Sequence, residues 1–297
     1  METENKNKKF LGPFYCLMAS LVWGSSFVAQ SVGGAMGTFT FNVARTVVGF
    51  FTLLPFAIIF VRKDLKKSGE KAKPVIKKTV IASLCCGLCY CIAENLQQYA
   101  FNFIESGKIG FITAFYMIFV PIFSIIMRKK VGLNAWIGVA FGIAGLYFLS
   151  IKPGSFTFGK GEIITLGCAL FFTFHILTID RFAGEVNGIA LSCGQFLVAF
   201  ILTLPFMLAF EEPTTAQIKA GLIPILYAGC CSCGIGYTCQ ILGQKYSSPT
   251  AASILMSFES VFSVIFGFLI LHETLDSRAI IGCVLMFVGI ILTQIKG

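Results

Sequence analysis

The sequence predicts an all-α membrane protein of ten transmembrane helices, arranged as two five-helix repeats of inverted topology. Of its 297 residues, 56% are hydrophobic and only 12% are charged, whereas soluble domains carry about 25% charged residues. Ten apolar stretches follow one another along the chain, and each has the length that a membrane-spanning helix needs. Their approximate limits are 11–31, 38–61, 78–102, 106–127, 132–151, 159–180, 188–210, 220–243, 248–271 and 278–296.

Basic residues are distributed unevenly between the two sides of the membrane. With the N-terminus inside, seventeen Lys and Arg residues fall on the inner side, five on the outer side and one, Arg45, within a helix. The loop from Arg62 to Lys78 alone holds eight of the twenty-three. Because Lys-rich and Arg-rich loops stay in the cytoplasm, we expect a multi-pass protein of the cell membrane with both termini cytoplasmic. Orientation therefore explains the net charge of +9, which does not indicate a nucleic-acid partner.

An internal repeat divides the chain into two halves. Residues 137–152 align with residues 281–296 at an offset of 144, with two glycines and the final Ile-Lys pair in register. The expected domains are therefore residues 1–152 and 153–297, each with five spans. Since five is odd, the second repeat enters the membrane the opposite way up from the first. That is the architecture of alternating-access carriers, whose binding site lies at the repeat interface near the membrane midplane.

Four segments carry a resemblance to a known family. They are Ala19–Ala29 (ASLVWGSSFVA), Phe41–Pro55 (FNVARTVVGFFTLLP), Gly107–Ser124 (GKIGFITAFYMIFVPIFS) and Lys245–Thr274 (KYSSPTAASILMSFESVFSVIFGFLILHET). In these segments, and in its repeat, the chain resembles the EamA family of the drug/metabolite transporter superfamily over essentially its whole length. It departs from the family at His272-Glu273, where Gly-Glu is common, and at the basic residues 128–130. The resemblance implies a carrier of the cytoplasmic membrane, commonly an exporter of amino acids or other small metabolites.

Glu259 is the first candidate functional residue. Ser248 suits an N-cap and Pro249 a first helical position, so the ninth stretch is expected to start there and to run unbroken across the bilayer. At about 1.5 Å of rise per residue, Glu259 falls near the midplane. An ionisable group at that depth is costly unless it faces the protein interior or a wet cavity, which indicates a functional role. The alternative is a protonated acid that joins helices through hydrogen bonds.

Opposite charges occur at one depth on the second and third helices. Arg45 and Glu94 both fall roughly 10 to 12 Å below the outer surface, where neighbouring antiparallel helices allow them to pair. Such a pair is either a static strut or a gate, whereas an unpaired Arg45 suits a substrate carboxylate. Gln98 shares a face with Glu94 because the two are four residues apart. We expect this polar stripe to point into the bundle or into a cavity.

The remaining candidates lie on three other helices. His175 aligns with Ser26 at an offset of 149, so the two are expected at equivalent points of the cavity wall. Tyr116 aligns with Glu259 at an offset of 143, a neutral phenol opposite an acid. Trp23 is expected to add an aromatic surface. Protonation of His175 or Glu259 would couple transport to a proton gradient, and the alternative for each candidate is ordinary packing or hydrogen bonding in the core.

The twelve cysteines fall almost entirely within apolar stretches, which disfavours a disulfide framework. Four of them, which we call the paired cysteines, match at the offset of 144: Cys86 and Cys89 with Cys230 and Cys233. This symmetry leaves open a soft-metal site or a membrane thiol redox enzyme. The neighbouring glycines favour structural thiols at close helix contacts, so no metal and no cofactor are expected. Glycines on the fifth and tenth helices fit either internal packing or a homodimer.

These observations together predict a secondary carrier, and not an enzyme, for small metabolites such as amino acids. Transport is expected to be outward and to proceed by alternating access. The predicted substrate-binding residues are Trp23, Ser26, Arg45, Glu94, Gln98, Tyr116, His175 and Glu259. The chain has no GxxxxGK[ST] nucleotide-binding loop, so a gradient must drive transport. The expected partners are a small-molecule substrate and the lipid bilayer, and the alternatives are an importer, a thiol redox enzyme and a non-transporting sensor.

Overall fold

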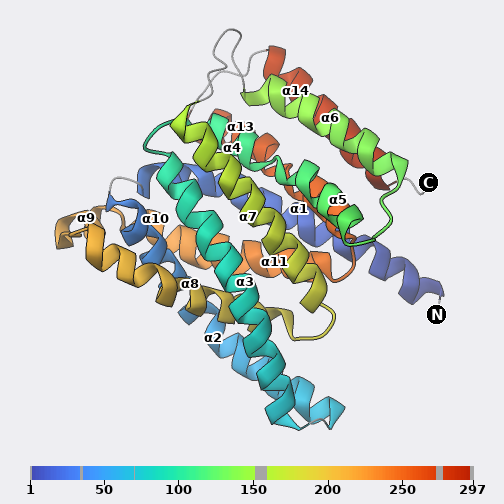
Figure 1. The fold of residues 1–297 in the computed structure, drawn as a ribbon, viewed down its shortest axis with the longest axis vertical. Helices are drawn as coiled ribbons and strands as arrows, with labels where there is room; N and C mark the ends of the chain where they lie inside the picture. Colours follow the sequence, from blue (N-terminus) through green and yellow to red (C-terminus); the bar gives the residue numbers. More distant parts are fainter. Residues whose placement is uncertain (1, 34–35, 70, 151–158, 272–276, 295–297) are drawn as a thin grey trace.

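The computed structural model describes residues 2–33, 36–69, 71–150, 159–271 and 277–294. Within these ranges the regular structure is helical and includes no strand (Figure 1). The helices are α1 (Glu2–Gly33), α2 (Thr38–Ser68), α3 (Ala72–Ala100), α4 (Ser106–Thr113), α5 (Tyr116–Ile126), α6 (Leu133–Ser150), α7 (Lys160–Phe182), α8 (Gly188–Phe210), α9 (Thr215–Ala220), α10 (Leu222–Tyr227), the π-helical η2 (Ala228–Tyr237), α11 (Thr238–Gln244), α12 (Pro249–Met256), α13 (Glu259–Leu271) and α14 (Ser277–Gln294). Two predicted features lie outside the described residues: the boundary between the halves at residues 152 and 153, and the pair His272-Glu273.

Eight segments of the described chain are long and apolar enough to cross a membrane. They are Phe10–Phe27, Thr38–Lys67, Ala72–Ala100, Lys108–Ile126, Lys160–Phe182, Gly188–Phe210, Leu222–Gln244 and Pro249–Phe266. The fifth and tenth predicted spans appear as shorter apolar helices, Leu133–Leu149 in α6 and Ser277–Thr293 in α14. This chain is therefore a multi-pass membrane protein.

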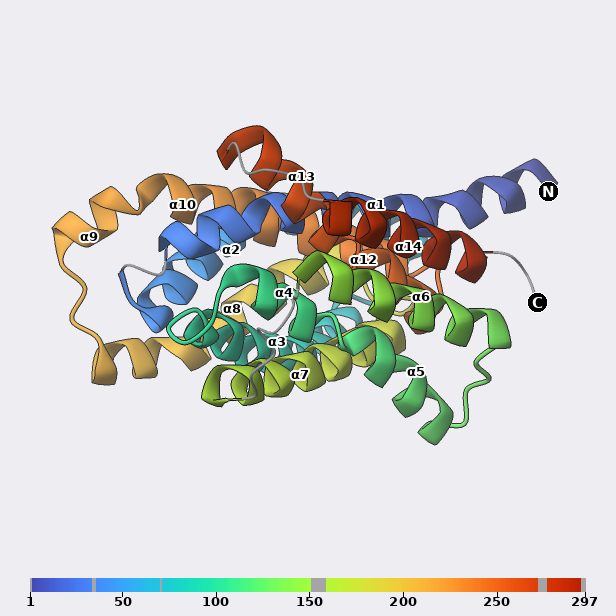
Figure 2. The ribbon, with the colours of Figure 1, turned by 90° about the horizontal axis from the view of Figure 1, so that it is seen from above.

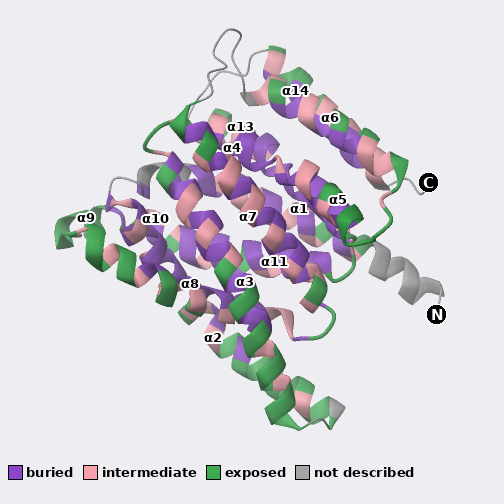
Figure 3. Ribbon diagram, viewed as in Figure 1, coloured by how far each residue is buried: buried purple, intermediate pink, exposed green. Residues whose placement is uncertain are grey.

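The exterior of the bundle is apolar, as a lipid environment requires. Large hydrophobic side chains on α8 and α10 are strongly exposed, among them Leu208, Phe210 and Ile223. Buried residues gather instead on the central helices, and Figure 3 shows the most continuous exposure on α9 and on the joined ends of α2 and α3. Those joined ends carry the predicted basic inner loop.

Several helix ends follow from local sequence. The Ser248 hydroxyl accepts a hydrogen bond from Ala251 N at 3.2 Å, and Pro249 is the first residue of α12. The predicted helix start is thus confirmed. Asn187 caps α8 in the same way by accepting from two backbone N–H groups. Such caps satisfy backbone donors that a helix N-terminus otherwise leaves without partners.

The fourth and ninth predicted spans are each broken near their middle. In the fourth, α4 ends and α5 begins where hydrogen bonds join residues three apart, from Phe115 N to Ile112 O and from Met117 N to Ala114 O. In the ninth, α12 gives way to α13 at residues 257–258, with a similar bond from Phe258 N to Leu255 O. Three-residue hydrogen bonds of this kind tighten the backbone and redirect the chain. The prediction of an unbroken ninth helix is therefore wrong, and Glu259 begins α13 instead of lying in mid-helix.

Helices α6 and α14 lie side by side at one edge of the bundle (Figures 1 and 2). A Cβ atom added to Gly145 would lie 2.7 Å from the carbonyl oxygen of Gly282, and one added to Gly282 would lie 2.7 Å from that of Gly145. Gly138 and Gly289 oppose each other in the same way, each at 2.9 Å. These glycines allow two backbones to approach closely, and they do so within one chain.

Candidate functional site

A small cavity, mostly apolar but with several polar side chains, lies among the buried residues of the bundle. Its volume is about 30 Å³, room for little more than ordered water. Both predicted halves contribute to its wall. The lining residues are Trp23, Phe27, Gln30, Glu94, Gln97, Thr113, Tyr116, Phe172, Ile176, Ser232, Tyr237, Gln240, Met256 and Glu259.

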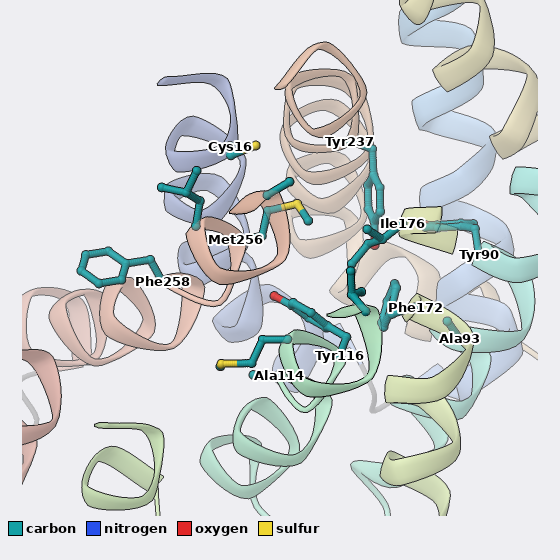
Figure 4. Close-up of a cluster of buried hydrophobic side chains, with 14 of the residues drawn as sticks. Cys16, Tyr90, Ala93, Ala114, Tyr116, Phe172, Ile176, Tyr237, Met256 and Phe258 are labelled. Carbon is teal, nitrogen blue, oxygen red and sulfur yellow. The ribbon is translucent and has the colours of Figure 1, made fainter. Parts of the chain in front are cut away.

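The apolar part of the wall comes from five elements, of which α1 supplies Trp23 and Phe27. Figure 4 shows Tyr116 from α5, Phe172 and Ile176 from α7, Met256 from α12 and Tyr237 from η2 gathered around one point. Aromatic rings and branched side chains of this kind bury a ligand's surface, while a few polar groups orient it.

Glu259 is the buried carboxyl group of the cavity. Its residue is 6% exposed, and its Oε1 accepts a hydrogen bond from the Tyr116 hydroxyl at 3.3 Å. No ion-pair partner of Glu259 occurs among the residues that the structure describes. As the first residue of α13, it lies at the positive end of the helix dipole, which favours a carboxylate only modestly. Most of the cost of burying its charge is thus left for another group to offset.

Glu94, the second carboxyl group of the wall, is paired. Arg45 Nη2 lies 2.8 Å from Glu94 Oε1, and the two side chains are 0% and 4% exposed. The Tyr237 hydroxyl donates to the same oxygen, while Arg45 Nη2 also donates to the Tyr90 hydroxyl at 3.1 Å. The pairing that the sequence left open is therefore present. Arg45 stands behind the wall, where it neutralises Glu94.

Four buried polar atoms on cavity-lining residues have no hydrogen-bond partner within the described part of the chain. They are Trp23 Nε1, Gln30 Oε1, Glu94 Oε2 and Gln240 Oε1. Buried polar atoms are usually paired with protein or with ordered water, so these four atoms are available to water or to a ligand in the cavity.

Comparison with known proteins decides the family. The model of the EamA-like transporter family matches residues 10–151 and 159–295. This chain belongs to the EamA-like transporter family. Two relatives carry the same broad description. An "Uncharacterized transporter" of Archaeoglobus fulgidus is 28% identical over 285 residues, covering 94% of this chain and 84% of its own. The "Uncharacterized transporter YoaV" of Bacillus subtilis is 24% identical and covers 93% of this chain and 94% of its own.

A solved structure shares the fold of this EamA-family chain. It is titled "Crystal structure of protein" and superposes with a TM-score of 0.76 at 17% identity, covering 95% of this chain and 96% of the other. At that identity the likeness concerns the fold alone. The family match and the transporter relatives indicate a membrane transporter.

Half of the eight predicted site residues line the cavity of this EamA transporter, namely Trp23, Glu94, Tyr116 and Glu259. The other four lie behind it or beside it. Arg45 pairs with Glu94, as described above. Gln98 Nε2 donates to the backbone oxygen of Gln30 at 3.2 Å, and the Ser26 hydroxyl donates to Val22 O at 2.8 Å.

His175 is fully buried but does not line the cavity. Its Nε2 lies 2.9 Å from Gln195 Oε1, and the rings of Tyr90 and Tyr237 each lie 5.9 Å from the imidazole. It belongs to an aromatic layer that supports the Arg45–Glu94 pair from behind.

The polar lining residues that sequence reasoning missed are mainly Gln30, Tyr237 and Gln240. Tyr237 follows Glu94 by 143 residues, the same offset that relates Tyr116 to Glu259. That repeat offset was the available signal. The two glutamines carry no such signal, because a single amide within an apolar stretch is equally typical of a bond between helices.

The paired cysteines are divided between two parts of the EamA bundle. Cys86 packs in a cluster with Ala82 and Leu191, whereas Cys233 lies in the main core, 3.7 Å from the Tyr90 hydroxyl. Among the described residues, no three His, Cys, Asp or Glu side chains gather as metal ligands would.

Proposed function

We propose that this EamA-family protein is a secondary carrier that moves a small metabolite across the cell membrane by alternating access. The observation that carries the proposal is the central cavity, lined from both halves of the chain and holding a buried carboxyl group without a cation. A static membrane protein gains nothing from such a site. A carrier needs one to recognise its substrate at the midplane.

The contacts at the cavity support two repeats related by a two-fold axis in the membrane plane. Tyr116 hydrogen-bonds to Glu259, and Tyr237 hydrogen-bonds to Glu94. The members of each pair are 143 residues apart, within one residue of the sequence offset. Around a two-fold axis, a residue near the axis touches its own counterpart. We infer that the axis passes through the cavity.

Helices α6 and α14 support the same inference. At the offset of 144, Gly138 corresponds to Gly282 and Gly145 to Gly289. Gly138 contacts Gly289, and Gly145 contacts Gly282, so each glycine meets the counterpart of the other. Reciprocal contacts of this kind are typical of an isologous, two-fold interface. An inverted pair of five-helix repeats with ten spans, divided at about residue 152, explains them.

Links between the two halves lie at both ends of α7. At its start, Lys108 Nζ lies 2.5 Å from Glu162 Oε1; near its end, Lys129 pairs with Asp180. With α7 crossing the membrane, one link lies on each side of the cavity. Such links, with a cavity of only about 30 Å³, fit an occluded conformation. Opening toward either side would require the link on that side to separate.

The orientation and direction complete the proposal. The excess of basic residues on the predicted inner side favours cytoplasmic termini, and the start of α1 lies on the same side of the bundle as the end of α14 (Figures 1 and 2). We propose outward transport of a small metabolite on the strength of the family resemblance. The importer is the alternative in direction.

Proteoliposomes test this function directly. The purified protein is reconstituted and assayed for uptake and release of a labelled panel of amino acids, amines and small metabolites. We expect saturable flux of at least one compound, reduced at least tenfold in Glu259→Gln. Glu212→Gln is the control, because Glu212 is also a carboxylate but is exposed and lies outside the cavity lining. Absence of flux for the whole panel, or an equal fall of flux and folded yield in Glu259→Gln alone, would overturn the proposal.

A further inference from the structure

We propose that the cavity is selective for an organic cation of the protonated-amine class, with Glu259 as its counter-charge. This inference rests on the proposed carrier function and names the substrate class of the same site. It departs from the amino-acid expectation, since a zwitterion also brings a carboxylate.

The balance of charge around the cavity is the first argument. Two carboxyl groups line it, Glu94 and Glu259, and no Lys or Arg is part of the lining. Arg45 offsets the charge of Glu94 from behind at 2.8 Å. Nothing in the described chain does the same for Glu259, whose contact is the neutral hydroxyl of Tyr116. A ligand with one positive charge makes the site neutral, whereas an anion adds to its negative charge.

The polar atoms without partners give the second argument. Three of the four are oxygen acceptors, on Gln30, Glu94 and Gln240, and the fourth is the indole N–H of Trp23. An ammonium group only donates hydrogen bonds, and it has up to three to give. The unfilled acceptors therefore match an ammonium donor. Among these four buried atoms, only the Trp23 N–H could donate to a ligand carboxylate.

The aromatic rings give the third argument. Trp23 and Tyr237 lie with ring centroids 4.7 Å apart at 54°, and both line the cavity with Tyr116 and Phe172. A cation near the face of such a ring is attracted by the ring quadrupole, most strongly by Trp, and the attraction grows where water is excluded. The same wall gives an anion no such attraction. The uncompensated charge of Glu259, the free hydrogen-bond acceptors and the aromatic rings of the lining thus all favour a cationic ligand.

The cavity contains its own reporter for a binding test. The chain has two tryptophans, Trp23 in the lining and Trp136 in α6. In full-length protein carrying Trp136→Phe, tryptophan fluorescence reports the cavity alone. The probes are n-pentylamine, n-pentanol of the same size, and norleucine, which is pentylamine with an added carboxylate. Each is titrated at pH 7 into protein in lipid nanodiscs, with Glu212→Gln, an exposed carboxylate outside the cavity lining, as the control.

We expect saturable quenching or enhancement by pentylamine, with an affinity at least tenfold above those of pentanol and norleucine. Glu259→Gln should reduce that preference to less than threefold, while Glu212→Gln should keep it. Glu259→Asp retains the charge on a shorter side chain, so it should keep the preference with weaker binding. This second variant decides the matter if Glu259→Gln does not fold.

Other outcomes overturn the inference. Equal affinities for the three probes, tighter binding of norleucine, no response to any probe, or full preference in Glu259→Gln would each contradict a cation site. The transport panel keeps the two proposals distinguishable. Flux of a neutral or zwitterionic compound that depends on Glu259 would leave a carrier with a different substrate class, whereas amine binding without any flux would leave a cation site that does not transport.

Discussion

Removal of the Arg45 charge tests how the buried ion pair is held. In Arg45→Met the side chain keeps much of its length, but Glu94 loses its cation while remaining 4% exposed. Breaking one partner of a buried pair typically costs about 3–5 kcal/mol, because the other charge is left without compensation. The Tyr237 hydroxyl still donates to Glu94, so we expect the lower half of that range. At about 2–4 °C per kcal/mol, the midpoint of unfolding should fall on the order of 10 °C.

The double variant Arg45→Met with Glu94→Gln shows whether the cost is electrostatic. With both charges gone, no uncompensated carboxylate remains, and most of the lost stability should return. The assay is thermal unfolding in detergent, followed by a thiol-reactive dye, since many of the twelve cysteines are buried and become reactive only on unfolding. An unchanged midpoint in Arg45→Met, or a double variant no more stable than the single one, would refute the argument.

Three further predictions concern the scaffold. The Glu211 carboxylate, at the end of α8, caps α2 by accepting hydrogen bonds from Phe39 N at 2.9 Å, Thr40 N at 2.6 Å and Thr40 Oγ1 at 2.7 Å. Glu211→Ala should therefore lower the free energy of unfolding by about 1–3 kcal/mol, measured by thermal unfolding. If it destabilises the protein no more than Glu212→Ala, which removes the exposed neighbour, the cap does not stabilise α2. Gly145→Ala should push α6 away from α14 and lower the free energy of unfolding by about 1–3 kcal/mol. Gly132→Ala should leave it unchanged, because the added methyl group enters open space. Equal unfolding temperatures for the two variants would contradict the close packing of α6 and α14. Replacing all four paired cysteines by Ser should leave flux within about twofold of wild type in proteoliposomes, while abolished activity would support the thiol redox enzyme or a soft-metal site.

The sequence predicted the membrane-spanning segments well because hydropathy measures the property that the bilayer selects. It failed at the two breaks, α4 to α5 and α12 to α13. Neither break is marked by Gly or Pro at the turning residues, so local propensity alone favours a continuous helix there. The three-residue hydrogen bonds span residues 112–118 and 255–260, next to the lining residues Tyr116, Met256 and Glu259. Local sequence does not indicate that these positions face a cavity.

The site was predictable where a residue type is costly in lipid. Glu94 and Glu259 are conspicuous by charge, and both line the cavity. Charge also drew attention to Arg45, but the sequence did not indicate which side of Glu94 it occupies. Gln30 and Gln240 were missed because an amide costs far less to bury than a carboxylate. A charged residue in an apolar helix is predicted to need a partner, because burying its charge alone costs free energy. Whether that partner is another side chain or a ligand depends on how the helices pack.

The central claim, one cavity open alternately to each side, is tested most directly by thiol accessibility. Ser232 lines the cavity and is buried, so Ser232→Cys is introduced into a chain whose exposed and half-buried cysteines are replaced by serine. A membrane-impermeant thiol reagent is then applied to right-side-out and to inside-out vesicles. We predict labelling at position 232 from either side, slowed by a saturating transported compound in both. Labelling from one side only, or from neither, would contradict alternating access.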